Sequence, residues 1–264
     1  MARHPAPSRR RARLSVGHAV VLGLIQGPAE LLPVSSSGHL VLIPALLDWP
    51  YARLPADVRK AFEVALHMGA GMALGWLLRE DARAAATDPV GTALLAGPAA
   101  SIALALEPVI EERASTPRIA AGAQIVSAAA MAAARPGTRT EATTVDRLLV
   151  GAAQACALVP GVSRNGATLT AARALGFDRD TAARLSWRAG LPIIAGATLL
   201  KVTRLAQRGL DPELRGPFAA GAAAAFASTL AAAPLLRVRH QRAIAAYRVA
   251  LGAFALHRLE WPRD

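Results

Sequence analysis

Residues 26–39 bring together an amide, a carboxylate, three hydroxyls and an imidazole in one short stretch. Almost wholly apolar runs flank it at 16–25, where His18 is the exception, and at 40–47. A charge at the centre of a bilayer costs roughly 2.5–3.5 kcal/mol, and irregular backbone at membrane depth is tolerated only where it is buried in protein or lines a wet cavity. We therefore interpret residues 26–39 first as a functional site and only second as a membrane span.

The acid and the imidazole of this stretch are candidates for catalysis. Gln26 and Glu30 are four residues apart and share one helix face. Glu30 is therefore a candidate ligand of a divalent cation, with Gln26 as a neutral oxygen ligand. Alternatively, Glu30 orients a base. His39 is a candidate nucleophile or general base, because imidazole titrates near neutrality. Ser36 is the alternative nucleophile, with His39 or Glu30 as its base. The competing interpretation of Glu30, His39 and Ser36 is structural: each would be a polar group that is hydrogen-bonded within a helix break or caps a helix.

A second cluster, residues 160–168, supplies a guanidinium. Arg164 has a rigid fork of donors that can hold phosphate oxygens bidentately, whereas a snorkelling cation near the membrane interface is the structural alternative. Glycines in the cluster let backbone and ligand approach closely. Helix capping is the expected role of Ser35 and Ser37, which are also candidates to touch phosphate. The candidate substrate contacts are Ser35, Ser37, Ser163, Asn165, Thr168, Gly161 and Gly166.

The elements that must position these groups are broken helices. Pro33 and Pro160 each remove a backbone donor and end a helix near the preceding residue, and the Ser residues that follow are good N-caps for a new helix. Free N–H groups and the positive dipole end at such a helix start attract anions such as phosphate. Each cluster is therefore predicted to be a re-entrant pair of half-helices.

The two clusters are related by an offset of 128 residues. Duplicated broken helices are the expected signature of inverted repeats with a site at the repeat interface. We predict repeat halves at 14–135 and 145–260, with both clusters facing one cavity. At this offset Gln26 meets Gln154, Gly23 meets Gly151, Ser35 meets Ser163, Gly38 meets Gly166 and Ser36 meets Arg164.

The composition indicates a membrane protein. Of 264 residues, 53% are hydrophobic and 18% are charged, against about 25% charged in soluble domains. An Ala-rich soluble bundle is disfavoured, because long amphipathic helices with a charged stripe are lacking. We predict an all-α polytopic membrane protein with one integral domain over 1–264. Apolar blocks lie at 89–106, 119–134, 191–200 and 216–236, and the last has the length of a membrane-spanning helix.

The basic residues limit the choice of partner. The net charge is +12, and Arg clusters lie at the ends of apolar segments, which fits loops against anionic headgroups and a lipid substrate that carries phosphate. Nucleic-acid binding is not expected, because these clusters flank apolar spans and aromatic residues make up only 4%. The single cysteine, Cys156, excludes an internal disulfide and a multi-cysteine metal site.

The two clusters closely resemble those of the undecaprenyl-diphosphate phosphatase family, the bacitracin-resistance type of lipid phosphatase. That family has a (Glu/Gln)-x-x-x-Glu motif running into P-x-S-S-(Ser/Thr)-G-H, and later P-G-x-S-R-S-x-x-T. Two residues depart from the common pattern: Gln26 stands where many members have Glu, and Asn165 replaces Ser. The matching segments here are Gln26 to Glu30, Pro33 to His39, Lys60 to Glu63, Pro160 to Thr168, Gly176-Phe177 and Ala246-Tyr247-Arg248.

The resemblance implies an enzyme of the bacterial inner (plasma) membrane, multi-pass and built from inverted repeats. It would hydrolyse undecaprenyl diphosphate to undecaprenyl phosphate and inorganic phosphate, and so recycle the carrier lipid for peptidoglycan synthesis. A divalent cation, Mg or Ca, is expected. The partners considered are a polyprenyl diphosphate lipid, membrane lipids and a second copy in a homodimer. The residues that the resemblance marks as functional are Glu30, Ser36, His39 and Arg164, with Gln26 in support.

Three alternatives bear on this interpretation. A lipid or small-anion transporter or flippase would use the same inverted-repeat cavity. The type-2 phosphatidic acid phosphatase superfamily shares S-G-H and S-R, but it needs a later His and Asp where Thr170 and Ala174 stand, so we set it aside. Glu63 and His67, one helical turn apart, are either a satisfied pair near the membrane interface or a support to the site.

Overall fold

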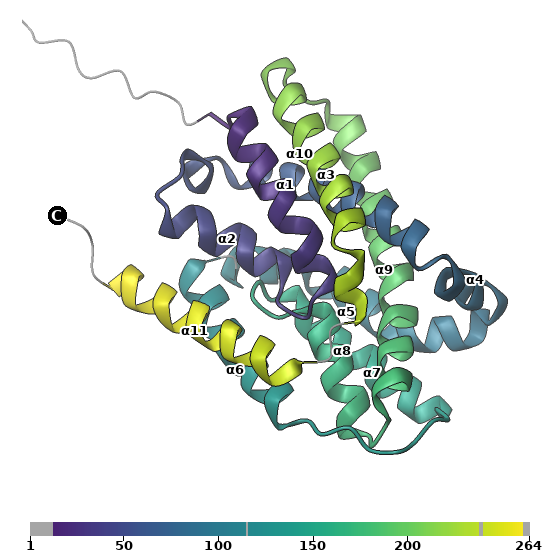
Figure 1. The fold of residues 1–264 in the computed structure, drawn as a ribbon. Helices are drawn as coiled ribbons and strands as arrows, with labels where there is room; N and C mark the ends of the chain where they lie inside the picture. The colour runs from purple at the N-terminus through teal and green to yellow at the C-terminus, as the bar shows by residue number, and fades with distance from the viewer. Residues whose placement is uncertain (1–12, 115, 238–239, 261–264) are drawn as a thin grey trace, which may run out of the picture.

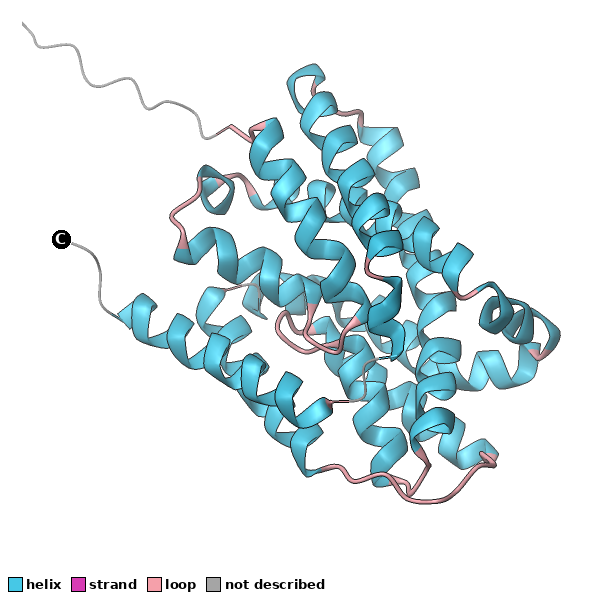
Figure 2. Ribbon diagram, in the orientation of Figure 1, coloured by secondary structure: helices cyan, strands magenta, loops and turns pink. Residues whose placement is uncertain are grey.

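The prediction of an all-α protein is confirmed by a computed structural model of the chain, which describes residues 13–114, 116–237 and 240–260 (Figures 1 and 2). Within these ranges every named element is a helix, and one isolated bridge joins Arg139 to Phe177. The elements are α1 (Val16–Leu31), α2 (Ser36–Leu46), η1 (Pro50–Arg53), α3 (Ala56–Leu77), α4 (Arg79–Thr87), α5 (Pro89–Ala114), α6 (Pro117–Ala133), α7 (Thr144–Gln154), η2 (Ala155–Leu158), α8 (Arg164–Ala174), α9 (Arg179–Arg208), α10 (Pro212–Ala231), η3 (Ala233–Arg237) and α11 (Gln241–Glu260).

Two helices of the described chain, α5 over Pro89–Leu106 and α9 over Arg179–Gln207, are long and apolar enough to cross a membrane. The pair α3 and α4, bent by 82°, makes a third candidate. The predicted apolar block at 216–236 is not one helix: α10 ends at Ala231 and η3 follows. Pro234 contributes to this break, because it removes one helical hydrogen bond and its ring crowds the carbonyl group four residues earlier.

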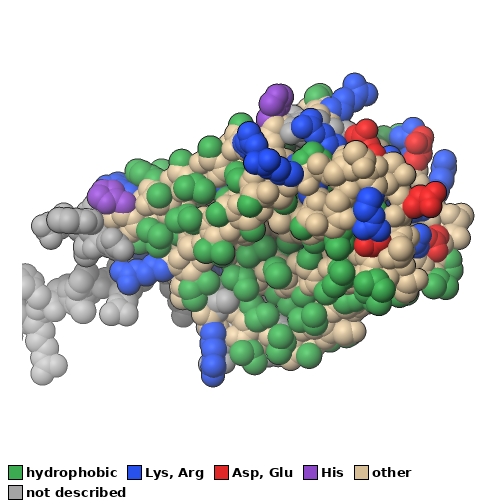
Figure 3. All heavy atoms as spheres, turned by 90° about the horizontal axis from the view of Figure 1, so that it is seen from below, with side chains coloured by type: hydrophobic (Ala, Val, Ile, Leu, Met, Phe, Trp, Pro, Cys, Tyr) green, Lys and Arg blue, Asp and Glu red, His purple; other side chains and the backbone are tan. Residues whose placement is uncertain are grey.

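Large apolar side chains point outward from several helices. Met72, Trp76, Val90, Leu104 and Val126 are each more than 60% exposed. Figure 3 shows apolar side chains over much of one face, with charged side chains gathered mainly toward its upper right. A surface this apolar is suited to lipid. The chain is therefore a membrane protein by its surface as well as by its helices.

Small residues let the helices of the bundle approach closely. Helix α10 lies alongside both α1 and α3 (Figure 1). A Cβ added to Gly27 of α1 would lie 2.4 Å from the backbone nitrogen of Thr229, and one added to Gly69 of α3 would lie 2.1 Å from the carbonyl oxygen of Ala222. Helices that pack within lipid commonly use small residues at their interfaces, because small residues let the two backbones approach closely.

Replacing Gly69 with Ala is expected to destabilise the protein by about 1–3 kcal/mol, because the added methyl group forces α3 away from α10. The matched control is Gly75→Ala on the same helix, where an added Cβ has nothing within 4 Å. That change should stabilise the helix by roughly 0.5–1 kcal/mol. Thermal unfolding in detergent checks both, and equal melting temperatures for the two variants would contradict the packing argument.

Elements recur at the offset of 128 residues. Helix α2 begins at Ser36 and α8 at Arg164, and both contain 11 residues. Helix α1 ends four residues before the Ser35 N-cap, and η2 ends five residues before the Ser163 N-cap. The repeat halves at 14–135 and 145–260, and their inverted relation, stay predictions.

Candidate active site

The first helix break lies between α1 and α2 and places Ser36 close to the end of α1. Helix α1 ends at Leu31, and Leu32 is extended. Ser35 then takes a positive φ of 70° and caps α2, its hydroxyl accepting a hydrogen bond from the N–H of Gly38 at 3.2 Å. A positive φ is uncommon for a residue with a side chain, so the turn is held by its surroundings. This turn brings the Ser36 hydroxyl back to Glu30, six residues earlier.

The second break also combines a residue of positive φ with a serine N-cap, but here the two roles fall to different residues. Helix α7 ends at Gln154, η2 follows, and Gly161 takes a positive φ of 97°. A Cβ on Gly161 would also lie 2.1 Å from the carbonyl oxygen of Ala120, so only glycine fits there. Ser163 caps α8 by accepting a hydrogen bond from the N–H of Gly166 at 3.1 Å. Arg164 is consequently the first residue of a helix that starts inside the protein.

The two breaks meet at Glu30. Its Oε2 accepts a hydrogen bond from the Ser36 hydroxyl at 2.7 Å, and its Oε1 accepts one from Arg164 Nη2 at 3.0 Å. The side chain of Arg164 is 14% exposed and that of Glu30 is 7% exposed. Asn165 adds a second link, since its Nδ2 donates to the carbonyl oxygen of Leu31 at 3.2 Å. The carboxylate thus lies between a hydroxyl and a guanidinium that are 128 residues apart in sequence.

Helix α9 holds the guanidinium from the other side, which the sequence did not indicate. Trp187 places its ring 5.9 Å from Arg164 Cζ. Gly190 leaves room for Arg164 Nη1, which would lie 1.8 Å from an added Cβ. Neither residue belongs to a recognisable motif, and a tryptophan and a glycine within an apolar helix read as packing residues. Only the approach of α9 to α8 reveals their contact with the site.

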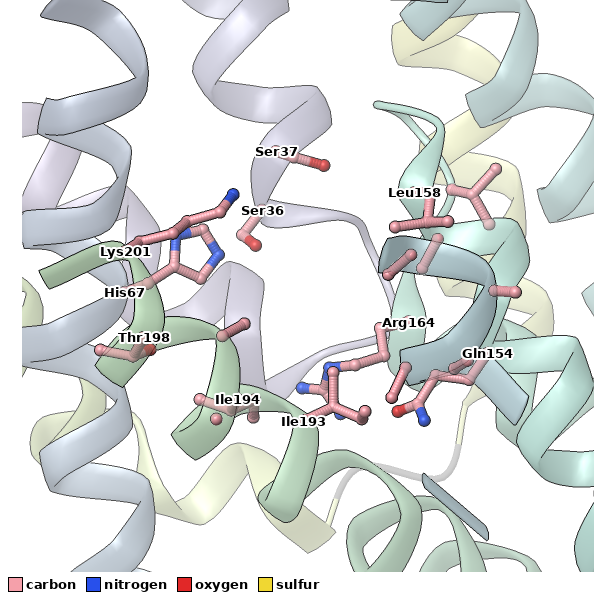
Figure 4. A pocket seen from close by; sticks show the side chains of 18 of the residues that line it. Ser36, Ser37, His67, Gln154, Leu158, Arg164, Ile193, Ile194, Thr198 and Lys201 are labelled. Carbon is pink, nitrogen blue, oxygen red and sulfur yellow. The ribbon is translucent and has the colours of Figure 1, made fainter. Parts of the chain in front are cut away.

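A cavity of about 670 Å³ opens at this carboxylate. In Figure 4, Ser36, His67 and Lys201 lie on one side of it, and Arg164 and Gln154 lie on the other. Much of the remaining wall is apolar and comes from α5 and α9. Of the predicted site residues, those that line the cavity are Glu30, Ser35, Ser36, Ser37, Ser163, Arg164 and Asn165.

Three predicted substrate contacts do not line this cavity, and their contact with a substrate stays a prediction. Thr168 is fully buried and its hydroxyl pairs with that of Ser186 at 2.6 Å. The carbonyl oxygen of Gly161 accepts a hydrogen bond from Arg248, and the N–H of Gly166 is taken by the Ser163 cap. These groups already have hydrogen-bond partners within the protein, which favours a supporting role at the break.

His39 also does not line the cavity. Its Nδ1 is 2.7 Å from the carbonyl oxygen of Ser35, which can only accept, so Nδ1 carries a hydrogen. Its Nε2 is 2.6 Å from the hydroxyl of Tyr247, which is the donor when the ring is neutral and the acceptor when the ring is protonated. Both nitrogens are therefore engaged, and the imidazole is 3% exposed. Of the two candidate nucleophiles, this placement favours Ser36.

Glu63 and His67 of α3 line the same cavity, which favours a supporting role over an isolated pair. Nδ1 of His67 donates to the carbonyl oxygen of Glu63 at 2.8 Å. Its Nε2 lies 3.8 Å from Glu30 Oε2, on the side of the carboxylate that also holds Ser36. Lys60 and Lys201 add two further cationic groups to the wall. The site is consequently richer in positive charge than the two motifs alone predict.

Of the two predicted metal ligands, Glu30 lines the cavity, whereas Gln26 is fully buried and does not. Gln26 donates from Nε2 to Glu30 Oε2 at 3.3 Å, while its buried Oε1 has no hydrogen-bond partner among the described residues. In the part of the chain that the structure describes, no group of three or more His, Cys, Asp or Glu could hold a metal. Magnesium usually keeps several waters and binds one or two carboxylates plus substrate phosphates, and Glu30 with Gln26 matches that sparse donor set.

Comparisons with known proteins cover nearly all of the described helices. A family model described as "Bacitracin resistance protein BacA" matches residues 19–254. A protein named undecaprenyl-diphosphatase from Geobacter sulfurreducens is 38% identical, over 85% of this chain and 90% of that protein. A protein of the same name from Thermomicrobium roseum is 38% identical, over 92% and 98%. Another from Geobacter metallireducens is 42% identical, over 73% and 78%.

Proposed function

The chain belongs to the bacitracin resistance protein BacA family, and from this membership and its site we infer that it is an undecaprenyl-diphosphatase. It hydrolyses undecaprenyl diphosphate to undecaprenyl phosphate and inorganic phosphate, and so recycles the carrier lipid for peptidoglycan synthesis. The observation that carries this is the Glu30 carboxylate, which bonds the Ser36 hydroxyl and the Arg164 guanidinium in the wall of one cavity. A base, a nucleophile and a phosphate-binding cation are the groups that phosphoanhydride cleavage requires.

In the first step Ser36 is the nucleophile. Glu30 Oε2 takes the proton of the Ser36 hydroxyl, with which it already shares a 2.7 Å hydrogen bond, as Oγ attacks the terminal phosphorus. The bond from that phosphorus to the bridging oxygen breaks, and undecaprenyl phosphate leaves with the bonding electrons. Arg164 shifts from Glu30 toward the phosphoryl oxygens and stabilises their charge in the transition state.

In the second step water releases the phosphate. A water molecule attacks the phosphoserine, the Oγ–P bond breaks, Ser36 regains its proton from Glu30, and both hydrogens of the water leave with the phosphate as dihydrogen phosphate. Inorganic phosphate leaves with the oxygen of the water. This scheme assigns no proton transfer to His39, whose two nitrogens are engaged by Ser35 and Tyr247. A chemical role of His39 stays a prediction that its placement does not support.

The lipid tail has an apolar route from the same cavity. Small and apolar residues of α5 and α9 form much of the wall, and both helices are candidate membrane spans. We propose that the prenyl chain leaves the cavity between them into lipid, while the diphosphate stays at Glu30. We also propose that the protein is a multi-pass protein of the bacterial inner membrane, which the two candidate spans support. The homodimer considered above stays a prediction.

A divalent cation, Mg or Ca, is proposed as a cofactor, and Glu30 with Gln26 would hold it. When bound it supplies positive charge to the phosphate oxygens. Chelation with EDTA is expected to lower phosphate release at least 10-fold, and added Mg or Ca should restore it. In the Gln26→Leu variant, half-maximal activity should need more cation than in the wild type. Full activity in EDTA after dialysis would remove the cation from the proposal.

The proposed activity is tested with the purified protein in detergent micelles, where no ion or lipid gradient exists. Undecaprenyl diphosphate should release one phosphate and yield the monophosphate, whereas undecaprenyl phosphate should release none. A short-chain prenyl diphosphate, compared in parallel, measures how much the apolar wall contributes to KM. Absence of phosphate release, with transport of a lipid or anion in vesicles, would instead support the transporter alternative.

A further inference from the structure

Arg248 of α11 is fully buried and donates to four oxygen atoms of the protein. Two belong to side chains of α6: Nε donates to Gln124 Oε1 at 2.7 Å, and Nη2 donates to the Ser127 hydroxyl. The other two are backbone carbonyls: Nη1 donates to Pro33 at 3.2 Å, and Nη2 donates to Gly161 at 3.0 Å. All four acceptors are neutral oxygens.

The two carbonyls come from the two helix breaks. Pro33 lies three residues before Ser36, and Gly161 lies three residues before Arg164. One guanidinium therefore spans the turns that present the nucleophile and the phosphate-binding cation. Helices α6 and α11, side by side in Figure 1, carry this connection outside the cavity wall.

Neighbouring polar groups on the same two helices hold the first break in place. Gln124 Nε2 donates to the carbonyl oxygen of Val34 at 2.9 Å, so one amide joins Arg248 to the turn. Tyr247, next to Arg248, reaches His39, which in turn bonds the carbonyl oxygen of Ser35. The carbonyl oxygens of residues 33, 34 and 35 thus all receive donors from this network.

Such donors are needed because the turns leave helical backbone groups unpaired. Carbonyls freed in a helix break at membrane depth are tolerated only with partners inside the protein, and an unpaired buried acceptor costs about 1–3 kcal/mol. A guanidinium has five N–H donors in a fixed plane, so the positions of its acceptors are fixed relative to one another. An ammonium group has one flexible centre and does not impose this geometry.

We propose that Arg248 is a positioning residue, which sets the separation between Ser36 and Arg164 by joining the two breaks through Pro33 and Gly161. This inference rests on the proposed function, because it concerns the alignment of that same site. Arg248 does not line the cavity and acts only through the backbone of the two turns. Misplacement of catalytic groups by about 1 Å lowers rates on the order of 100-fold.

The first test compares Arg248→Met with Arg173→Met. Arg173 of α8 is also buried and donates to Gln241 of α11, so the control removes a buried guanidinium that contacts α11 but donates to neither Pro33 nor Gly161. Arg248→Met is expected to lower kcat on undecaprenyl diphosphate about 100-fold, with a smaller change in KM. Arg173→Met should keep kcat within about 3-fold when both are scaled to folded protein. Arg248→Lys should recover less than a tenth of the lost activity, since it keeps the charge without the fork.

The second test separates alignment from loss of stability. If Arg248 acts by placing Arg164, the two substitutions should not be independent. Arg164→Ala should then lower kcat/KM less than about 10-fold in the Arg248→Met background, against 100-fold or more in the wild type. Equal losses of kcat/KM in both backgrounds would overturn the inference, because independent residues have multiplicative effects on rate.

Should Arg248→Met fail to fold, Gln124→Met serves in its place. This variant is expected to have about a 10-fold lower kcat, and a wild-type kcat would contradict the inference. A wild-type protein that releases no phosphate would refute the proposed function instead.

Discussion

Replacing Ser36 with Ala is expected to abolish turnover, lowering kcat by about 10⁴-fold or more with little change in substrate binding. The Ser36 hydroxyl is the only one of the three in residues 35–37 for which the described structure gives a hydrogen bond to the Glu30 carboxylate. Its removal leaves Arg164 and the cavity in place but takes away the attacking atom. Phosphate release from undecaprenyl diphosphate by purified protein measures the loss.

Ser37→Ala is the matched control for this prediction. Ser37 also lines the cavity, but its hydroxyl pairs with that of Ser35 at 3.3 Å. A loss of no more than about 10-fold is expected, the size of one neutral hydrogen bond. Rapid quenching of the wild type during turnover should trap phosphate on Ser36. If Ser36→Ala keeps more than a tenth of wild-type kcat, the nucleophile is another group, and His39 becomes the next candidate.

Replacing Arg164 with Ala should lower kcat/KM by about 10²–10³-fold, the usual cost of one transition-state donor. Part of this loss has a second cause, since Glu30 then keeps its charge in a largely buried place without its cationic partner. Arg164→Lys should restore only part of the activity, because an ammonium cannot hold two phosphate oxygens with the geometry of a fork. Steady-state kinetics on undecaprenyl diphosphate check both variants.

Arg188→Ala is the control for this prediction. Arg188 lies on α9 near Trp187 and Gly190, which hold Arg164, but it donates to the carbonyl oxygen of Ala84 on α4. Its removal is expected to leave kcat/KM within about 3-fold of wild type. Near-wild-type turnover in Arg164→Ala would take that residue out of the mechanism and leave the positive charge of the cavity to Lys60 and Lys201.

The local construction of both breaks could be predicted from residue types alone. Pro33 ends a helix by its chemistry, and the Ser35 and Ser163 hydroxyls cap the helices that follow, as their positions indicated. Close approach at Gly161 was also predicted, although the partner is the backbone of Ala120 rather than a ligand. These features depend on a few neighbouring residues, so a single sequence contains the information.

The direction of each polar side chain could not be predicted in this way. His39 belongs to the motif that marks the site, yet its ring turns to Tyr247, 208 residues later. Arg248 was identified only as part of the matching segment Ala246-Tyr247-Arg248, and it proves to be fully buried and bonded to both breaks. A side chain at a helix break has several partners within reach, and its choice depends on helices that arrive from distant parts of the chain.

By itself the sequence determined the helical class, the membrane setting, the two breaks and the residue types available for phosphate chemistry. Only the tertiary structure decided that Glu30 joins Ser36 to Arg164, that His39 does not line the cavity, and that α6 and α11 tie the breaks together. The physical reason is the distance along the sequence over which each interaction acts. Caps, proline breaks and apolar periodicity act over a few residues, whereas the pairing of a buried carboxylate with a guanidinium 134 residues away requires the packed bundle.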